Sequence, residues 1–273
     1  MASGPTACST TERLWHCLHW GLYGKQSLWC STARNHRSFG DPVLCTPISV
    51  GGVRTTFHEQ LDALLAQLSA LCRLTEVALA QATHALLEAD LATAEQVISD
   101  HDLVASLAQR CEERAVTLLA LQAPVARDLR TVVATLNLVD DLLRMGVLAE
   151  HVAHIARRRH PHCAVPAAAR TVITKMAEVA GSMAAAATSL LIDHDPDRAA
   201  ALVTQDATID ALRDQLTTQL LQPDWDAGIP AAVDLTQLGR WYERYADHTV
   251  AIAHHITYLT TGQRPTTPSP ERP

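Results

Sequence analysis

Apolar residues recur every three or four positions along most of the chain, which is the spacing of an amphipathic α-helix. In the first and last segments of this region, the spacing alternates between three and four residues, which is the heptad spacing of packed helices. The positions on this seam are Phe57, Leu61, Leu64, Leu68, Leu71, Ala78 and Ala82 in the first segment, and Leu235, Leu238, Tyr242, Tyr245, Thr249, Ile252, Ile256 and Leu259 in the last. The sequence therefore predicts long helices that each bury one face, with both tyrosines in the core.

Turn-forming residues divide this pattern into six predicted helices. Pro124 suits the first turn of the third helix, because a missing backbone N–H costs nothing there, and Gly262 is typical of a helix end. The apolar positions of the third helix are Val125, Leu129, Val132, Leu136, Val139 and Leu143. The predicted helices begin near residues 57, 91, 124, 167, 197 and 231, and a loop at 222–230 precedes the last.

The last three predicted helices repeat the first three. Residues 141–146 match 241–246, and the segment around His101 matches that around Asp206, at an offset of roughly one hundred residues. We therefore predict an all-α fold of two tandem three-helix bundles, with six antiparallel helices. The predicted boundaries are residues 53–157 for the first repeat, 158–166 for a solvated basic linker, 167–262 for the second repeat and 263–273 for a disordered tail.

Residues 1–52 differ in composition from the rest of the chain. They hold four of the seven Cys, three of the five Trp and six of the eleven Gly, but only two acidic residues. Polar residues interrupt the apolar ones too often for a clean signal peptide. Two interpretations stay open, a disordered extension or a translation start at Val53, and the second is favoured. In both cases the segment lies outside the predicted fold.

Composition excludes several functional classes. The net charge of −7 and the pI near 6.0 argue against a nucleic-acid-binding protein. The longest apolar run, residues 183–192, is far too short to span a membrane. No Cys-x-x-Cys spacing indicates a zinc site or a disulfide framework, so a reducing cytoplasm fits best.

Two pairs of carboxylates are the strongest chemical signal. Asp206 and Asp210 lie four residues apart on one predicted helix, and Glu243 and Asp247 on the next. Such pairs share a helix face and repel each other unless a cation lies between them. The cation is either a metal ion or an arginine, and Arg213, Arg240 and Arg244 are the candidates. Carboxylates without thiols select a hard ion, so Mg²⁺, Mn²⁺ or iron is expected if a metal binds.

The chain resembles the PhoU family of phosphate-uptake regulators from about residue 53 to residue 262. The resemblance rests on the proline segment 123–130, on 141–149 and 240–248, which are similar to the two family signatures, and on the ending 256–262. It implies a cytoplasmic homodimer that connects the ATPase of a phosphate ABC transporter to a sensor histidine kinase. Such a regulator holds the phosphate-starvation response off when phosphate is plentiful, and its acidic helix faces bind metal clusters.

The first repeat departs from that family pattern. His101, Ala105, Leu143 and Val147 stand where the second repeat has its four acids, so a metal site is expected in the second repeat only. His248 is expected to pack between helices or beside the ligands, and His254 to lie on the surface. Asp128 and Arg130 fit a functional role or a simple complement to the helix dipole equally well.

The sequence contains no arrangement of residues that would indicate an enzyme instead of a regulator. It contains no Glu-x-x-His pair, which di-iron helical bundles need, and no phosphate-binding glycine loop. The alternatives are a generic helical scaffold and, more remotely, a carboxylate-bridged metalloenzyme. A scaffold has no need of acid pairs on adjacent helices, which favours the regulator.

Overall fold

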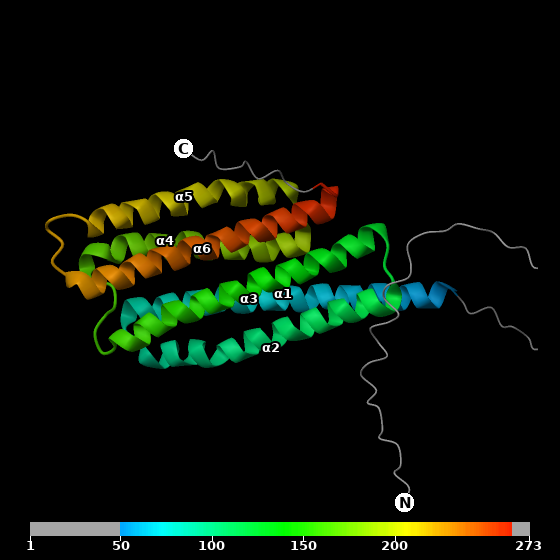
Figure 1. Cartoon of the computed structure of the whole chain (residues 1–273), viewed down its shortest axis with the longest axis horizontal. Helices are drawn as coiled ribbons and strands as arrows, with labels where there is room; N and C mark the ends of the chain where they lie inside the picture. The colour runs from blue at the N-terminus through cyan, green and yellow to red at the C-terminus, as the bar shows by residue number, and fades with distance from the viewer. Residues whose placement is uncertain (1–49, 264–273) are drawn as a thin grey trace, which may run out of the picture. The chain divides into compact units, whose positions relative to one another are not determined.

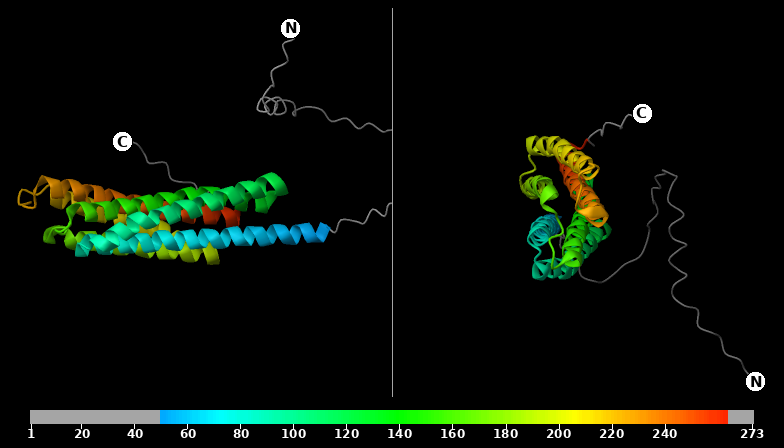
Figure 2. Two further views of the ribbon diagram at one scale, coloured as in Figure 1. Left: turned by 90° about the horizontal axis from the view of Figure 1, so that it is seen from below. Right: turned by 90° about the vertical axis from the view of Figure 1, so that its left-hand side faces the viewer.

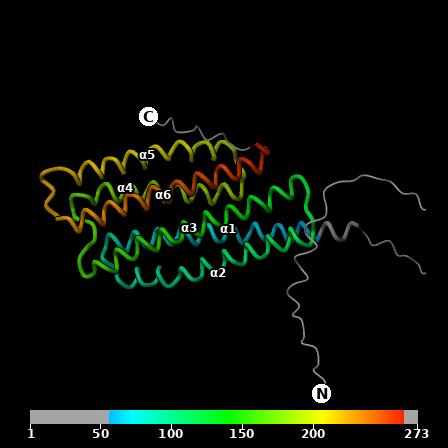
Figure 3. The backbone as a smooth tube through the Cα atoms, in the orientation of Figure 1, coloured from blue at the N-terminus to red at the C-terminus, as the bar shows by residue number. Residues whose placement is uncertain are grey.

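The computed structural model of the 273-residue chain describes residues 50–263, and their side chains from residue 56 onward. Within this range the chain forms six α-helices, shown in Figures 1 and 3. They are α1 (Val50–Glu88), α2 (Leu91–Gln122), α3 (Ala126–Arg159), α4 (Ala167–Asp193), α5 (Pro196–Leu220) and α6 (Gly228–Thr261). The predicted all-α fold is confirmed.

The helices form two groups of three that lie side by side (Figure 2). Helices α1, α2 and α3 contact one another, and so do α4, α5 and α6. The two groups meet where α3 contacts α6 and where α1 contacts α4, so that α2 and α5 lie on the outside. The two predicted repeats are therefore joined along four central helices.

The buried apolar residues form one continuous core through both repeats. Tyr242 and Tyr245 on α6 are fully buried, as the heptad pattern predicts. The Tyr242 hydroxyl shares a 2.7 Å hydrogen bond with the Thr83 hydroxyl, and the Tyr245 hydroxyl donates to the Thr75 carbonyl oxygen at 3.1 Å. Because a buried hydroxyl needs a partner, these two bonds fix α6 of the second repeat on α1 of the first.

Helix α3 runs antiparallel to α6 over its whole length. Near its start, the Arg130 guanidinium packs against Gly262, the left-handed residue that ends α6. A cation at this position complements the partial negative charge of a helix C-terminus. At the other end of α3, Arg158 and Arg159 pair with Asp234 in the second turn of α6. Both ends of the contact between the repeats are thus held by arginine.

The pairing with Asp234 corrects the predicted linker. Helix α3 continues to Arg159, so the first two residues of the 158–166 segment are helical. Arg158 and Arg159 were expected to be solvated linker residues, yet both bind the Asp234 carboxylate, which is only 5 % exposed. A buried carboxylate needs such partners because its desolvation is otherwise unfavourable, and the sequence pattern gives no indication of this contact.

The beginning of α3 also differs from expectation. Pro124 lies before the helix instead of in its first turn, and the helix begins at Ala126 after the extended residue Val125. Val125 and Leu129 were expected in the apolar seam but are 71 % and 41 % exposed. The heptad spacing fixes which residues share a face, but it does not say whether another helix covers that face at its end.

Helix α1 is long and apolar enough, over Thr56–Glu88, to cross a membrane by length and composition alone. Leu64, Leu68 and Leu71 are buried in the core, where α1 contacts α2, α3 and α4, whereas Leu74 is 38 % exposed. We therefore interpret α1 as a core helix. It begins at Val50, three residues before the predicted boundary at Val53. The expectations for the preceding residues and for the tail after Gln263 lie outside the described residues.

We predict that Asp234→Ala lowers the free energy of unfolding by about 2 kcal/mol. The change leaves Arg158 and Arg159 without a buried partner, and the partial exposure of both arginines moderates the loss. The measurement is urea unfolding followed by circular dichroism. Asp140→Ala is the control, because Asp140 is 63 % exposed in its pair with Arg144 and should cost less than about 0.5 kcal/mol. Equal losses in the two variants would contradict this account of the α3–α6 contact.

Candidate functional site

The four predicted carboxylates face one another across α5 and α6. Asp206 and Asp210 lie on α5, and Glu243 and Asp247 on α6. Burial raises the pKa of Asp206 to about 6, and the charges of Asp247, Asp210 and Glu243 add to that effect. Partial burial likewise raises the pKa of Asp247, with Glu243 the largest contributor among the neighbouring acids. We call these four residues the acidic cluster.

Two arginines approach the acidic cluster, and both act on Glu243. Arg240 Nη1 donates to Glu243 Oε1 at 2.7 Å, and Arg213 Nε lies 3.7 Å from Glu243 Oε2. Arg213 also pairs with Asp214 at 2.9 Å, outside the cluster. Arg244, the third candidate cation, instead lies near His151 and helps to lower the pKa of that histidine, whose burial is the main cause. Neutralisation of the acidic cluster by arginine is thus incomplete.

The donor atoms of the cluster suit a hard metal ion. Asp206 Oδ1 and Glu243 Oε2 are buried without a hydrogen-bond partner, and the Glu243 side chain is only 10 % exposed. Oxygen ligands of this kind fit Mg²⁺, Mn²⁺ or iron. Among the described side chains, however, no three His, Cys, Asp or Glu residues are arranged to hold one ion. The residue types fit a metal, whereas binding requires the side chains to turn toward a common centre.

The first repeat carries a different set of groups at the matching place. His101, which corresponds to Asp206, lies 3.7 Å from Glu150, and His154 lies 3.2 Å from the other Glu150 oxygen. The ring of His151 packs against Trp241 of α6, with the ring centroids 5.1 Å apart. This cluster was missed in the sequence, although Glu150 and His154 have the same i, i+4 spacing as the acid pairs.

A second group of histidines connects the two repeats. Asp141 on α3 accepts from His248 Nδ1 at 3.0 Å and from His255 Nε2 at 3.3 Å, both on α6. Burial alone would raise the pKa of Asp141, but these two hydrogen bonds outweigh it and hold the pKa below its ordinary value. His248 therefore packs between helices, as expected, and its partner is a carboxylate of the other repeat.

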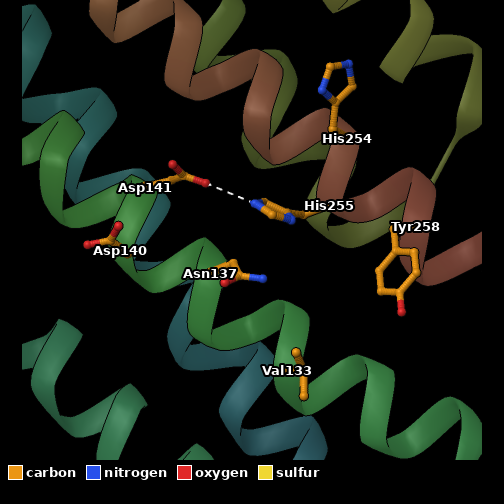
Figure 4. A pocket seen from close by; sticks show the side chains of 7 residues that line it. All are labelled: Val133, Asn137, Asp140, Asp141, His254, His255 and Tyr258. Carbon is orange, nitrogen blue, oxygen red and sulfur yellow. Dashed lines mark ion pairs between the residues drawn. The ribbon is translucent and has the colours of Figure 1, made fainter. Parts of the chain in front are cut away.

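Figure 4 shows Asp141 and His255 pointing toward one another beside a surface pocket of about 430 Å³. The pocket lies between α3 and α6 and is lined by Val133, Asn137, Asp140, Asp141, His254, His255 and Tyr258. His254 was expected on the surface, but its side chain is partly buried. This burial lowers the pKa of His254, and the charge of His255 lowers it further.

Asp128 lies in the first turn of α3, where a negative charge complements the helix dipole.

The fold is that of a two-repeat, six-helix bundle with an acidic face on its second repeat. The PhoU domain matches residues 68–156 and 173–256, and the chain belongs to the PhoU family. It is 47 % identical over 213 residues to "Phosphate-specific transport system accessory protein PhoU homolog 2" of Mycobacterium tuberculosis, covering 78 % of this chain and 100 % of that protein. It is 44 % identical to homolog 1 of Mycobacterium leprae, over 78 % of this chain and 96 % of the relative.

Solved structures agree with this assignment. The crystal structure of PhoU from Pseudomonas aeruginosa superposes with a TM-score of 0.70 at 26 % identity, over 76 % of this chain and 100 % of that one. The phosphate transport system regulatory protein PhoU from Streptococcus pneumoniae gives a TM-score of 0.71 at 24 % identity, over 77 % and 100 %. The resemblance noted in the sequence is confirmed.

We predict that Asp206→Asn stabilises the metal-free protein at neutral pH. Because the folded-state pKa of Asp206 is about 6 and its ordinary value 3.8, the folded protein binds this proton more tightly than the unfolded chain. The resulting stabilisation is complete below about pH 4 and is lost as the pH rises through 6. The variant should lack this loss and exceed the wild type at pH 7 by about 1 kcal/mol, allowing for solvent screening.

The measurement is urea unfolding of EDTA-treated protein between pH 4 and pH 7. Asp214→Asn is the control, because Asp214 lies on the same helix with its side chain 71 % exposed. This variant should keep the pH dependence of the wild type. A variant at Asp206 with the same decline from pH 4 to pH 7 as the wild type would show that the pKa of Asp206 is not raised in the folded protein.

Proposed function

We propose that this protein regulates phosphate uptake and the phosphate-starvation response in the cytoplasm, as an accessory protein of a phosphate transport system. It connects the ATPase of a phosphate ABC transporter to a sensor histidine kinase and represses the response when phosphate is plentiful. The relatives are named as accessory proteins of phosphate-specific transport systems, which supports the association with transport machinery. The protein acts by contact and not by turnover, and it acts as a homodimer.

One observation carries the contact mechanism: both repeats expose apolar side chains at equivalent positions. Around the α2–α3 turn these residues are Leu121, Leu129 and Val133, and around the α5–α6 turn they are Leu221, Ile229 and Val233, one hundred residues further along. Val125 adds a fourth exposed apolar side chain to the first group. We call the two groups the tip patches. Exposed apolar residues that gather in one place, instead of being scattered singly, are typical of protein–protein contact sites.

The antiparallel arrangement of α3 and α6 places the two tip patches at opposite ends of the helical bundle (Figure 1). Helix α3 has 34 residues, which corresponds to a length of about 50 Å. Two contact sites at that separation suit a protein that touches two partners at once. This is the geometry expected of an adaptor between a transporter component and a kinase. A purely structural scaffold gains nothing from leaving the same positions exposed twice.

We further propose that the acidic cluster holds a divalent or trivalent metal ion, with Asp206, Asp210, Glu243 and Asp247 as ligands and iron, Mn²⁺ or Mg²⁺ as the ion. The support is the all-oxygen donor set and the two buried carboxylate oxygens without hydrogen bonds. A bound cation would relieve the mutual repulsion of the carboxylates and connect α5 to α6. The first repeat lacks the equivalent oxygens at Ala105, Leu143 and Val147.

Replacement of Leu121 and Val125 by Ser should derepress phosphate-starvation genes in phosphate-rich medium. Expression should approach that of a strain without the gene, because the patch loses its apolar contact area. The fold should persist, since these side chains are 75 % and 71 % exposed. Reporter expression, together with the melting temperature of the purified variant, provides the measurement. The matched control is Val203→Ser, which removes an exposed valine outside both patches.

Two outcomes would count against the proposed regulator. If the gene is deleted in a strain without a paralogue and the phosphate-starvation genes remain repressed, the scaffold is favoured. Metal-dependent phosphate-ester hydrolysis by the purified protein, lost in Asp247→Ala, would favour the enzyme.

Purified protein dialysed against Mn²⁺ should retain the metal, and the double replacement of Glu243 and Asp247 by Ala should abolish retention. Loss of two oxygen ligands lowers the affinity of a hard-ion site far below that needed for retention. Elemental analysis after gel filtration gives the stoichiometry. Glu112→Ala with Glu113→Ala removes the same charge from exposed positions of α2 and should leave retention unchanged. Equal metal content in both double variants would exclude the assigned ligands.

A further inference from the structure

The arginines beside the acidic cluster bind one carboxylate of the four. Arg240 lies three residues before Glu243 on α6 and donates to its Oε1 at 2.7 Å. Arg213 approaches the other oxygen, Oε2, from α5, but at 3.7 Å the contact is too long for a hydrogen bond. Both Arg213 Nε and Glu243 Oε2 are buried without a hydrogen-bond partner. Glu243 is therefore held mainly by Arg240.

Arg240 is much more exposed than the carboxylate that it binds. Its side chain is 56 % exposed, whereas that of Glu243 is 10 % exposed. Arg240 can thus move into solvent at little cost, while Glu243 stays at the buried edge of the cluster.

We propose that Arg240, assisted by Arg213, competes with the metal ion for Glu243, so that metal binding releases the Arg240 guanidinium to the surface. This inference rests on the metal site proposed above. The hydrogen bond from Arg240 occupies Glu243 Oε1, one of the oxygens that a metal ion bound at the acidic cluster would need as a ligand. Binding of a metal ion turns Glu243 inward and places a second positive charge beside Arg240, which repels it.

The consequence is that metal occupancy changes the charge presented on α6. In the metal-free protein Arg240 is neutralised by Glu243, and in the metal-bound protein its guanidinium is free to pair with an anionic group of a partner. Guanidinium groups form strong, directed hydrogen bonds to carboxylates and phosphates. Arg240 is thus a positioning residue for Glu243 when the metal is absent and a surface cation when it is present.

The test is the affinity of purified, EDTA-treated protein for Mn²⁺, measured by isothermal titration calorimetry on the wild type and on Arg240→Gln. Glutamine keeps much of the side-chain length but removes the charge, so Arg240→Gln should bind Mn²⁺ at least tenfold more tightly. Arg213→Gln should strengthen binding less, because Arg213 makes the longer contact and also pairs with Asp214. Arg244→Gln is the control, since it removes a neighbouring arginine that faces His151 instead, and its affinity should equal that of the wild type.

A second measurement follows the arginine itself. In the NMR spectrum of the wild type, the side-chain N–H signals of Arg240 should shift toward those of a solvent-exposed arginine on titration with Mg²⁺, which is diamagnetic. Signals of Arg244 should not move. This readout does not depend on any variant and therefore holds even if Arg240→Gln unfolds.

The outcomes separate this inference from the metal site itself. Tighter binding in Arg240→Gln, or binding by this variant alone, supports the competition. Equal or weaker Mn²⁺ affinity in Arg240→Gln, with wild-type binding intact and the Arg240 signals unmoved by Mg²⁺, overturns the competition and leaves the metal site standing. Failure of both proteins to bind Mn²⁺ removes the metal site, and the competition with it.

Discussion

The antiparallel contact of α3 with α6 is the interaction on which the rest of the structure depends. It fixes the second repeat on the first through Arg130 at one end and through the pairing of Arg158 and Arg159 with Asp234 at the other. Without this contact, Tyr242 and Tyr245 of α6 would lose their burial and their hydrogen bonds to α1. The two repeats are separate in sequence, but their apolar residues form one core.

The two repeats occupy equivalent places in the fold and yet differ in chemistry. Each repeat places an outer helix, α2 or α5, against a central one and leaves a polar site between them. In the first repeat this site holds His101, Glu150 and His154, and in the second it holds carboxylates. The backbone geometry accommodates both sets, because the four matching positions of the first repeat are only partly buried, at the edge of the core. Divergence at such positions changes the chemistry without changing the fold.

The sequence predicts what depends on spacing along one helix and misses what depends on contacts between distant helices. The acid pairs follow from an i, i+4 spacing, and the short α5–α6 loop makes the two helices neighbours. Asp141 and His248 stand 107 residues apart, and nothing in the local pattern connects them. The burial of Asp234 and the exposure of Val125 were missed for the same reason. Periodicity identifies the residues that share a face, whereas tertiary packing decides which faces are covered.

The acidic cluster is not a requirement of the fold, since the first repeat has Ala105, Leu143 and Val147 at three of the four matching positions. Its cost is visible in the raised pKa of Asp206 and in the two buried oxygens without hydrogen bonds. Apolar residues would serve the stability of the bundle better at such positions, and the first repeat has them at Ala105, Leu143 and Val147. The unfavourable burial at Asp206 and Asp247 is the physical reason for proposing a cation at the acidic cluster, with Arg240 as its competitor for Glu243.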